Sequence, residues 1–154
     1  RRVLFRSGKA LAKNMVRKPT RRERLEKFQE SEEVIAGLPI IRQTEKLMDT
    51  LNHLVVEYPR YERYALGSQT RAVMQEFFEL LVTAAKKYTK KTTLRDADIK
   101  FFLLKRLIHI ALRRHYISIG QYEELVVNYL LDIGNQLGGW IQKESDRESQ
   151  GRKT

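Results

Sequence analysis

The sequence has 154 residues, which suits one small domain, and its 30 Lys and Arg against 19 Asp and Glu give a net charge of +11. A chain this basic is usually attracted to nucleic acid or to another anionic surface. It has no cysteine, which excludes disulfide scaffolds, thiolate metal sites and cysteine nucleophiles. Its apolar runs are too short to cross a bilayer, so we predict no membrane span and expect a cytoplasmic location.

Most of the charge excess lies in the first 39 residues. Residues 1–24 hold ten basic residues and one acid, whereas residues 25–154 are close to neutral. Because apolar residues are sparse in 1–39, we expect a mobile basic segment, in which 23–34 could form a marginal helix. The opening residues 1–7 resemble the translation of a sequencing adapter, and we expect translation to begin later, at Met15. The charge of this segment is therefore a poor indicator of function.

Helical periodicity begins at Ile40. Apolar residues recur at helical spacing over 40–58, and Pro59 cannot continue the backbone hydrogen bonding, so the first helix should end there. A second helix is predicted over 66–88. The link between the two carries Tyr61 and Tyr64, which we expect to fold back on the bundle end rather than to stack on nucleic-acid bases.

The third helix is predicted from 94 to about 114. Thr93 is its expected N-cap, and Asp96 and Asp98 are expected in the first turn, where the helix dipole favours negative charge. Apolar residues cover well over half of its circumference, whereas a helix in a monomeric bundle needs about a third to a half. We infer that this helix is buried on a second side, against another subunit.

The fourth helix opens with Ser118 and Gln121, which have the spacing of a capping box. Gly134 and Gly138 lie about one turn apart within it. Because glycine costs up to about 1 kcal/mol relative to alanine in a helix, we expect a compensating close approach of a neighbouring helix or subunit.

Four helices with short links predict an all-α fold, an up-down-up-down four-helix bundle over 40–144 whose third helix packs against another subunit. Residues 1–39 precede the bundle as the basic segment. Residues 145–154 follow it as a polar tail, which we expect to fray.

The basic residues of the bundle fall into two clusters. No acid occurs between Asp98 and Glu123, although a solvated helix would mix both signs of charge, so this stretch is interpreted as a face for phosphates or an acidic partner. The alternative is a solvated basic stripe. The second cluster lies at the corner between helices two and three, where cations could simply complement a helix dipole. The candidate nucleic-acid or polymerase-binding residues are Lys86, Lys87, Lys90, Lys91, Arg95, Lys105, Arg106, His109, Arg113 and Arg114.

Enzymatic hypotheses find little support in the sequence. His53, His109 and His115 lack the partners of known metal sites, and no Arg precedes them at the spacing of helical RNases. The chain also lacks a phosphate-binding glycine loop and a nucleophile-elbow motif. We predict no catalytic residue, no metal site and no cofactor.

Several stretches of the bundle resemble known families. The stretch 58–69 resembles the corner motif of the four-helix-bundle family that includes the proteins of 23S ribosomal RNA intervening sequences. The pattern around 98–100 with 107–118, and the ending 122–141, resemble accessory variability determinant (Avd) proteins of diversity-generating retroelements. The resemblance covers about residues 40–143.

The resemblance implies a barrel-shaped homopentamer of four-helix bundles without catalytic activity of its own. It implies that a basic surface associates with the reverse transcriptase and the template RNA of the retroelement, and supports mutagenic copying of a template repeat into a variable gene. The alternatives are a bundle of the ribosomal RNA intervening-sequence type, whose role is undefined, and, less favoured, a helical nuclease.

Overall fold

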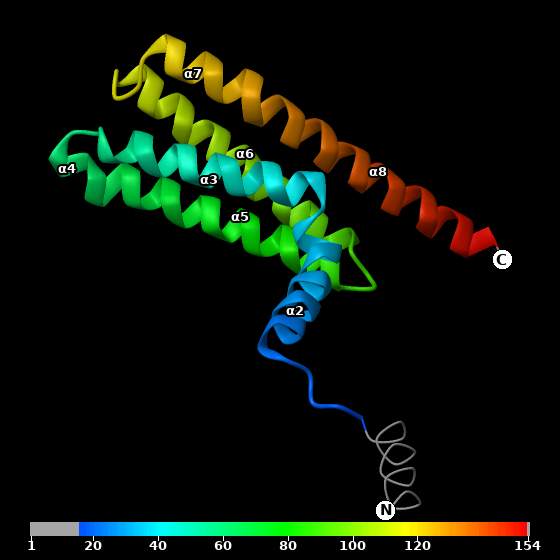
Figure 1. The fold of residues 1–154 in the computed structure, drawn as a ribbon. Helices are drawn as coiled ribbons and strands as arrows, with labels where there is room; N and C mark the ends of the chain where they lie inside the picture. Colours follow the sequence, from blue (N-terminus) through cyan, green and yellow to red (C-terminus); the bar gives the residue numbers. More distant parts are fainter. Residues whose placement is uncertain (1–15, 154) are drawn as a thin grey trace, which may run out of the picture. The chain divides into compact units, whose positions relative to one another are not determined.

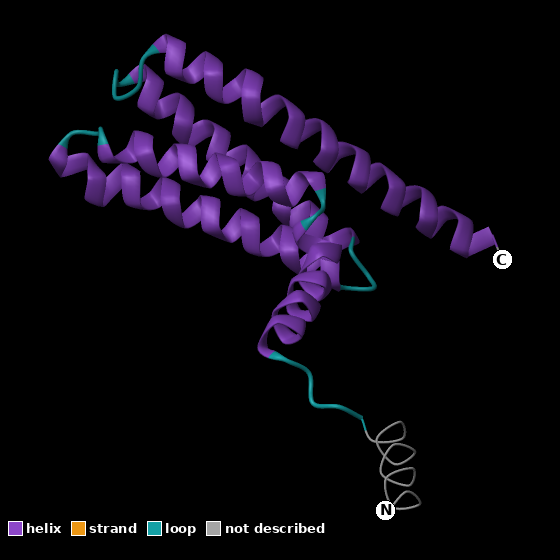
Figure 2. Ribbon diagram, viewed as in Figure 1, coloured by secondary structure: helices purple, strands orange, loops and turns teal. Residues whose placement is uncertain are grey.

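The computed structural model describes residues 16–153 (Figure 1). Every regular element in this part of the chain is a helix, so the predicted all-α class is confirmed (Figure 2). None of the helices described is long and apolar enough to cross a membrane. The expectations about residues 1–7 and Met15 lie outside the described residues. The chain divides into two compact units, Arg1–Val34 and Ile35–Thr154, and we call the second the helical body.

Helix α2, Arg21–Ala36, contains the marginal helix expected over 23–34 and extends it at both ends. Its start is capped reciprocally: the Glu23 backbone N–H donates to the Thr20 hydroxyl at 3.2 Å, and the Thr20 N–H donates to the Glu23 carboxylate at 3.3 Å. No residue of α2 is buried, in keeping with the sparse apolar residues of this segment.

The first two predicted helices are present with shifted boundaries. Helix α3, Pro39–Val56, starts with a proline whose fixed φ suits the first helical position, and it ends just before Pro59. The second predicted helix starts earlier than expected, because α4, Arg60–Glu62, a π-helical segment η1, Arg63–Gly67, and α5, Ser68–Lys86, follow one another without a break.

Helix α6, Lys91–Arg113, also starts earlier than predicted. Thr93 is only 6% exposed and lies inside the helix, so the expected N-cap at Thr93 is wrong; Lys90 occupies that position without a side-chain cap. For the same reason Asp96 and Asp98 lie beyond the first turn, which contains no acid. The physical cause is core packing, since Leu94 is fully buried and draws the preceding turn into the helix.

The last helical stretch comprises α7, Ile119–Leu125, a second π-helical segment η2, Val126–Leu130, and α8, Leu131–Lys153. The predicted capping box is confirmed, with the Gln121 N–H donating to the Ser118 hydroxyl at 3.1 Å and the Ser118 N–H donating to the Gln121 side chain at 2.9 Å. The expected fraying after residue 144 is wrong, because α8 continues to Lys153.

One hydrophobic core holds the helical body together. Helix α5 packs against α3 and α6, and α8 contacts both α3 and α6 (Figure 1). The Phe77 and Phe101 rings stack across α5 and α6 with centroids 5.1 Å apart. A Cβ on Gly134 would lie 3.3 Å from the Phe101 ring, so the predicted close approach is confirmed there, whereas Gly138 has no atom within 4 Å of that position.

Candidate nucleic-acid interface

Five exposed residues follow one stripe along α6, and we call this stripe the outer face of α6. They are Arg95, Ile99, Phe102, Arg106 and Arg113. Ile99 is 65% exposed and Phe102 is 62% exposed, so part of the wide apolar arc of this helix is left uncovered by the chain itself. At 1.5 Å per residue, the three arginines are spaced by about 17 and 11 Å along the helix axis.

The arginines of this face differ from the other cations of α6 in their partners. Lys100 pairs with Glu76 of α5 at 2.7 Å, and Arg114 pairs with Glu62 at 3.6 Å. Among the residues that the structure describes, Arg95, Arg106 and Arg113 form no salt bridge within 4 Å. Their guanidinium groups are therefore available to an anionic partner.

Lys105 and His109 lie at the edge of this face in different settings. The Lys105 ammonium lies over the Phe101 ring, 4.8 Å from its centroid, and 5.9 Å from the centroid of Phe102. His109 is half-buried against the edge of Tyr122, with centroids 6.2 Å apart, and its buried Nδ1 has no hydrogen-bond partner in the described chain. Lys105 is thus exposed to a partner, whereas His109 is largely covered.

The second predicted cluster lies at the α5–α6 corner. Lys86 ends α5, while Lys90 and Lys91 stand at the start of α6, where the helix dipole disfavours positive charge. Complementing a helix dipole explains Lys86 and also Lys90, whose Nζ donates to the Ala85 carbonyl in the last turn of α5 at 3.4 Å, but it does not explain Lys91. Lys91 is compensated by Glu148 of α8 at 2.8 Å, and this hydrogen bond lowers the pKa of the Glu148 carboxyl.

The ten predicted residues do not gather into one patch. The lysine cluster and Arg95 lie at the start of α6, and Arg113 and Arg114 lie at its end, about 35 Å away along a helix of 23 residues. The outer face of α6 connects the two groups.

Tyr61 and Tyr64 depart from the prediction. They are 72% and 85% exposed, so the expectation that they fold back on the bundle end is wrong. The buried position is taken by Tyr58, whose ring lies 5.6 Å from that of Tyr116. The sequence pattern alone does not distinguish three tyrosines spaced by three residues, of which only the first is buried.

No group of three or more His, Cys, Asp or Glu residues in the described part of the chain could hold a metal ion.

Comparison with known proteins identifies the family. The family model described as bAvd-like matches residues 38–144, from the residue before α3 to the middle of α8. Comparison with curated proteins and with solved structures gave no match. Because the matched segment makes up most of the chain and contains the whole of α6, the protein belongs to the bAvd-like family of Avd-type proteins.

Proposed function

We propose that this protein is a non-catalytic accessory subunit of a diversity-generating retroelement. It binds the reverse transcriptase and the template RNA through its basic surface and thereby supports mutagenic cDNA synthesis. Membership of the bAvd-like family supports the accessory role. It also favours this role over that of a ribosomal RNA intervening-sequence protein.

The observation that carries the binding proposal is the outer face of α6. Three arginines without salt-bridge partners in the described chain flank the exposed side chains Ile99 and Phe102, with Arg95 on one side and Arg106 and Arg113 on the other. A face that served only for solubility would pair its cations with acids one turn away, which this face does not do. Arginines that contact phosphates give affinity without reading sequence, which suits a subunit that holds RNA for a polymerase.

We further propose that α3, α5, α6 and the α7–α8 stretch form an up-down-up-down four-helix bundle, and that copies of it assemble into a ring, a homopentamer by the resemblance. Support comes from the apolar side chains Val127 of η2 and Leu131 of α8, which are exposed on the helical stretch that packs against α6. Burial of such side chains between copies would stabilise the assembly. Light scattering on the full chain tests this, and a monomer at all concentrations would contradict it.

The binding proposal is tested with two triple variants of equal charge. The first, R95Q/R106Q/R113Q, removes the arginines of the outer face of α6. The second, R42Q/K46Q/R71Q, removes three exposed cations of α3 and α5 and serves as the control. Affinity for template RNA is measured between 50 and 300 mM salt, and co-purification with the reverse transcriptase is scored in parallel.

We expect the affinity of the wild-type protein to fall steeply as the salt concentration rises. The salt slope should drop by about 2 in the first variant, at about 0.7 per lost phosphate contact on a single strand, and much less in the control. Equal affinity at both salt concentrations would contradict the electrostatic mechanism. Equal losses in both variants would show that bulk charge, rather than this face, binds RNA.

A further inference from the structure

We propose that the end of the helical body formed by the α3–α4 and α6–α7 links binds unpaired nucleotides, whose bases stack on Tyr61 and Tyr64 while neighbouring arginines hold the phosphates. We call residues 58–64 together with 112–119 the tyrosine end. The inference rests on the proposed RNA-binding function and names its substrate class, which is single-stranded nucleic acid.

Contacts between the two links make the tyrosine end a defined surface. The Tyr58 and Tyr116 rings lie 5.6 Å apart, and an Arg114 Nη1 to Glu62 Oε2 ion pair of 3.6 Å joins the same two links. Burial, followed by a hydrogen bond with Tyr61, raises the pKa of the Tyr116 hydroxyl. The exposed Tyr61 of one link thus lies next to Tyr116 of the other.

The backbone of both links supports this geometry. His115 has a left-handed backbone with φ of 64°, and the Tyr116 N–H donates back to the Ala111 carbonyl at 2.9 Å. This turn ends α6 and places Tyr116 against Tyr58.

The π-helical segment η1 leaves Tyr64 exposed, while the last two residues of the same segment are buried. Leu66 and Gly67 lie in the core, and a Cβ at Gly67 would lie 2.6 Å from Cγ1 of Val55. Only glycine allows this close approach of η1 to α3. Extra residues in π-helical turns are frequent at functional sites, where they redirect side chains.

The rings of Tyr61 and Tyr64 are unusual in being uncovered. A tyrosine in a folded protein normally buries its ring, and Tyr58 of the same end is only 1% exposed. Within residues 16–153, no aromatic ring or cation lies over either ring face. Every base has a π-face, so an exposed tyrosine ring binds unpaired bases with little regard to sequence.

The charge of the tyrosine end selects an anionic partner. The tyrosine end has four arginines, which are Arg60, Arg63, Arg113 and Arg114. Its one carboxylate is Glu62, and Glu57 adjoins it, so positive charges outnumber negative ones. Glu62 is paired with Arg114, and Arg63 donates its Nε–H to the Tyr58 carbonyl at 3.0 Å, which holds its guanidinium at this corner. Uncovered rings beside fixed guanidiniums match the alternation of base and phosphate along a single strand.

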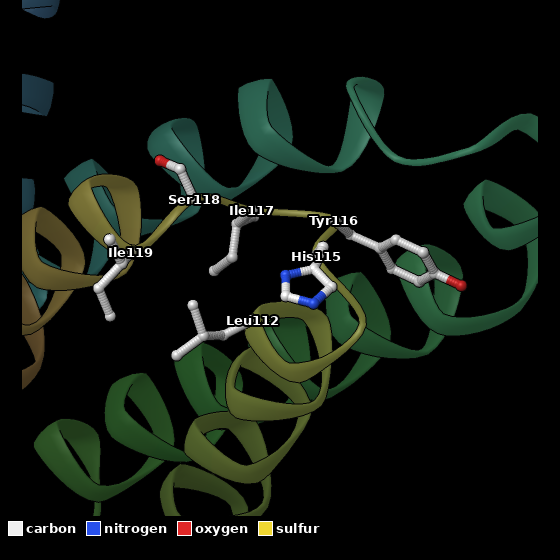
Figure 3. Close-up of a pocket in the computed structure, with 6 residues that line it drawn as sticks. All are labelled: Leu112, His115, Tyr116, Ile117, Ser118 and Ile119. Carbon is white, nitrogen blue, oxygen red and sulfur yellow. The ribbon is translucent and has the colours of Figure 1, made fainter.

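A hollow of about 540 Å³ adjoins this surface on the α6–α7 side. Leu112, Ile117 and Ile119 extend into it, with His115 beside them, and the Tyr116 ring extends away from it toward the other link (Figure 3). Such apolar walls next to the arginines offer a place for a base that leaves the stack.

The test uses the full-length protein and a short oligoribonucleotide that contains 2-aminopurine, whose fluorescence falls when the base stacks on a ring. Binding is compared for the single strand and for the same sequence in a duplex. The variants are Y61A/Y64A, which removes both rings, and Y61F/Y64F, which keeps the rings and removes the hydroxyls. Since both side chains are exposed, circular dichroism and thermal unfolding should be unchanged in either variant.

We expect Y61A/Y64A to weaken single-strand binding by about tenfold or more and to abolish the fluorescence loss, because each stacked base contributes about fivefold or more. Y61F/Y64F should bind within about twofold of wild type, and duplex binding should be unchanged in both variants.

Unchanged single-strand affinity in Y61A/Y64A, with RNA binding by the wild type intact, would overturn this inference and leave the proposed function standing. Equal losses for single strand and duplex would overturn it as well, because the two rings would then contribute to binding without recognising unpaired bases. Loss of reverse transcriptase co-purification with RNA binding intact would identify a protein-docking surface instead. If the wild type bound no RNA, the proposed function would fail as well.

Discussion

The two ends of the helical body carry similar numbers of cations but present their aromatic rings differently. At the lysine end, which we define as residues 86–91, Arg147 lies 4.9 Å from the centroid of the Tyr88 ring, and Lys90 lies 5.6 Å from that of Trp140. At the tyrosine end, no cation or aromatic ring of the described chain lies over Tyr61 or Tyr64, so the ends differ in what covers the rings and not in exposure, since Tyr88 is 84% exposed. A cluster of cations without an uncovered ring binds phosphates whether or not the bases are paired. Guanidinium groups beside uncovered rings can also distinguish unpaired from paired bases, because only unpaired bases stack on the rings. The number of cations at each end is therefore a poor guide to which end is suited to single strands.

The largest expected effect on stability concerns Tyr58, the buried tyrosine of the tyrosine end. Burial raises its pKa from 10.0 to about 12, so the folded protein holds this proton more tightly than the unfolded chain. The contribution of Tyr58 to the free energy of unfolding is therefore fully present below pH 10. It falls by about 2–3 kcal/mol as the pH rises toward 12.

Tyr58→Phe should lack this alkaline loss. Chemical denaturation of both proteins from pH 8 to 12 measures it, and the difference between them cancels the titration of the lysines. The same pH dependence in both proteins would show that Tyr58 is less buried than the structure indicates.

The next effect distinguishes two glycines. A Cβ at Gly67 would overlap Val55 at 2.6 Å and lie 3.3 Å from the Glu62 carbonyl, so Gly67→Ala should destabilise the protein by about 1–3 kcal/mol. Gly138 has open space around it, and Gly138→Ala should stabilise by up to about 1 kcal/mol through helix propensity. Urea denaturation measures both, and a destabilised Gly138→Ala protein would point to close packing that a single chain does not show.

A smaller effect is expected at the lysine end. The variant K86Q/K87Q/K90Q should weaken RNA binding by about tenfold at low salt, equally for single strand and duplex, because an ammonium group neutralises a phosphate without contacting the bases. Fluorescence anisotropy measures both affinities, with R42Q/K46Q/R71Q as the control of equal charge. A loss confined to the single strand would show that this end also recognises unpaired bases, and the contrast between the two ends would fail.

The helices of the body were predictable because their apolar periods are strong and their signals local. Pro59 ends the first helix, and Ser118 with Gln121 opens the last, and both act through hydrogen bonds within a few residues. The N-cap prediction at Thr93 failed for a tertiary reason. A threonine hydroxyl is a good cap in isolation, but Thr93 precedes the buried Leu94 and lies within the helix. Tertiary packing thus overrode a local preference.

The candidate site was predictable in composition but not in arrangement. The run of cations without acids points to α6, yet only the fold shows that Lys100 and Arg114 are paired while Arg106 and Arg113 are not. The exposure of Tyr61 and Tyr64 could not be predicted either, because it depends on which tyrosine of an evenly spaced set meets Tyr116. Such partners are distant in sequence and leave no periodic signal.

The smallest expected effect concerns the end of α8, which the sequence predicted to fray. The hydrogen bond from Lys91 lowers the pKa of Glu148 from its ordinary value of 4.5. A lowered carboxyl pKa contributes stability above the ordinary value, and this contribution is lost as the pH falls through the lowered one. Amide hydrogen exchange in residues 144–153, corrected for intrinsic rates, should therefore be faster at pH 3 than at pH 7. Glu148→Gln should show the faster exchange already at pH 7, whereas Glu123→Gln, an exposed carboxylate of α7 without a salt bridge in the described chain, should not. Protection at pH 7 that is the same in Glu148→Gln and wild type would mean that helix propensity alone orders this end, and that the lysine end does not hold α8.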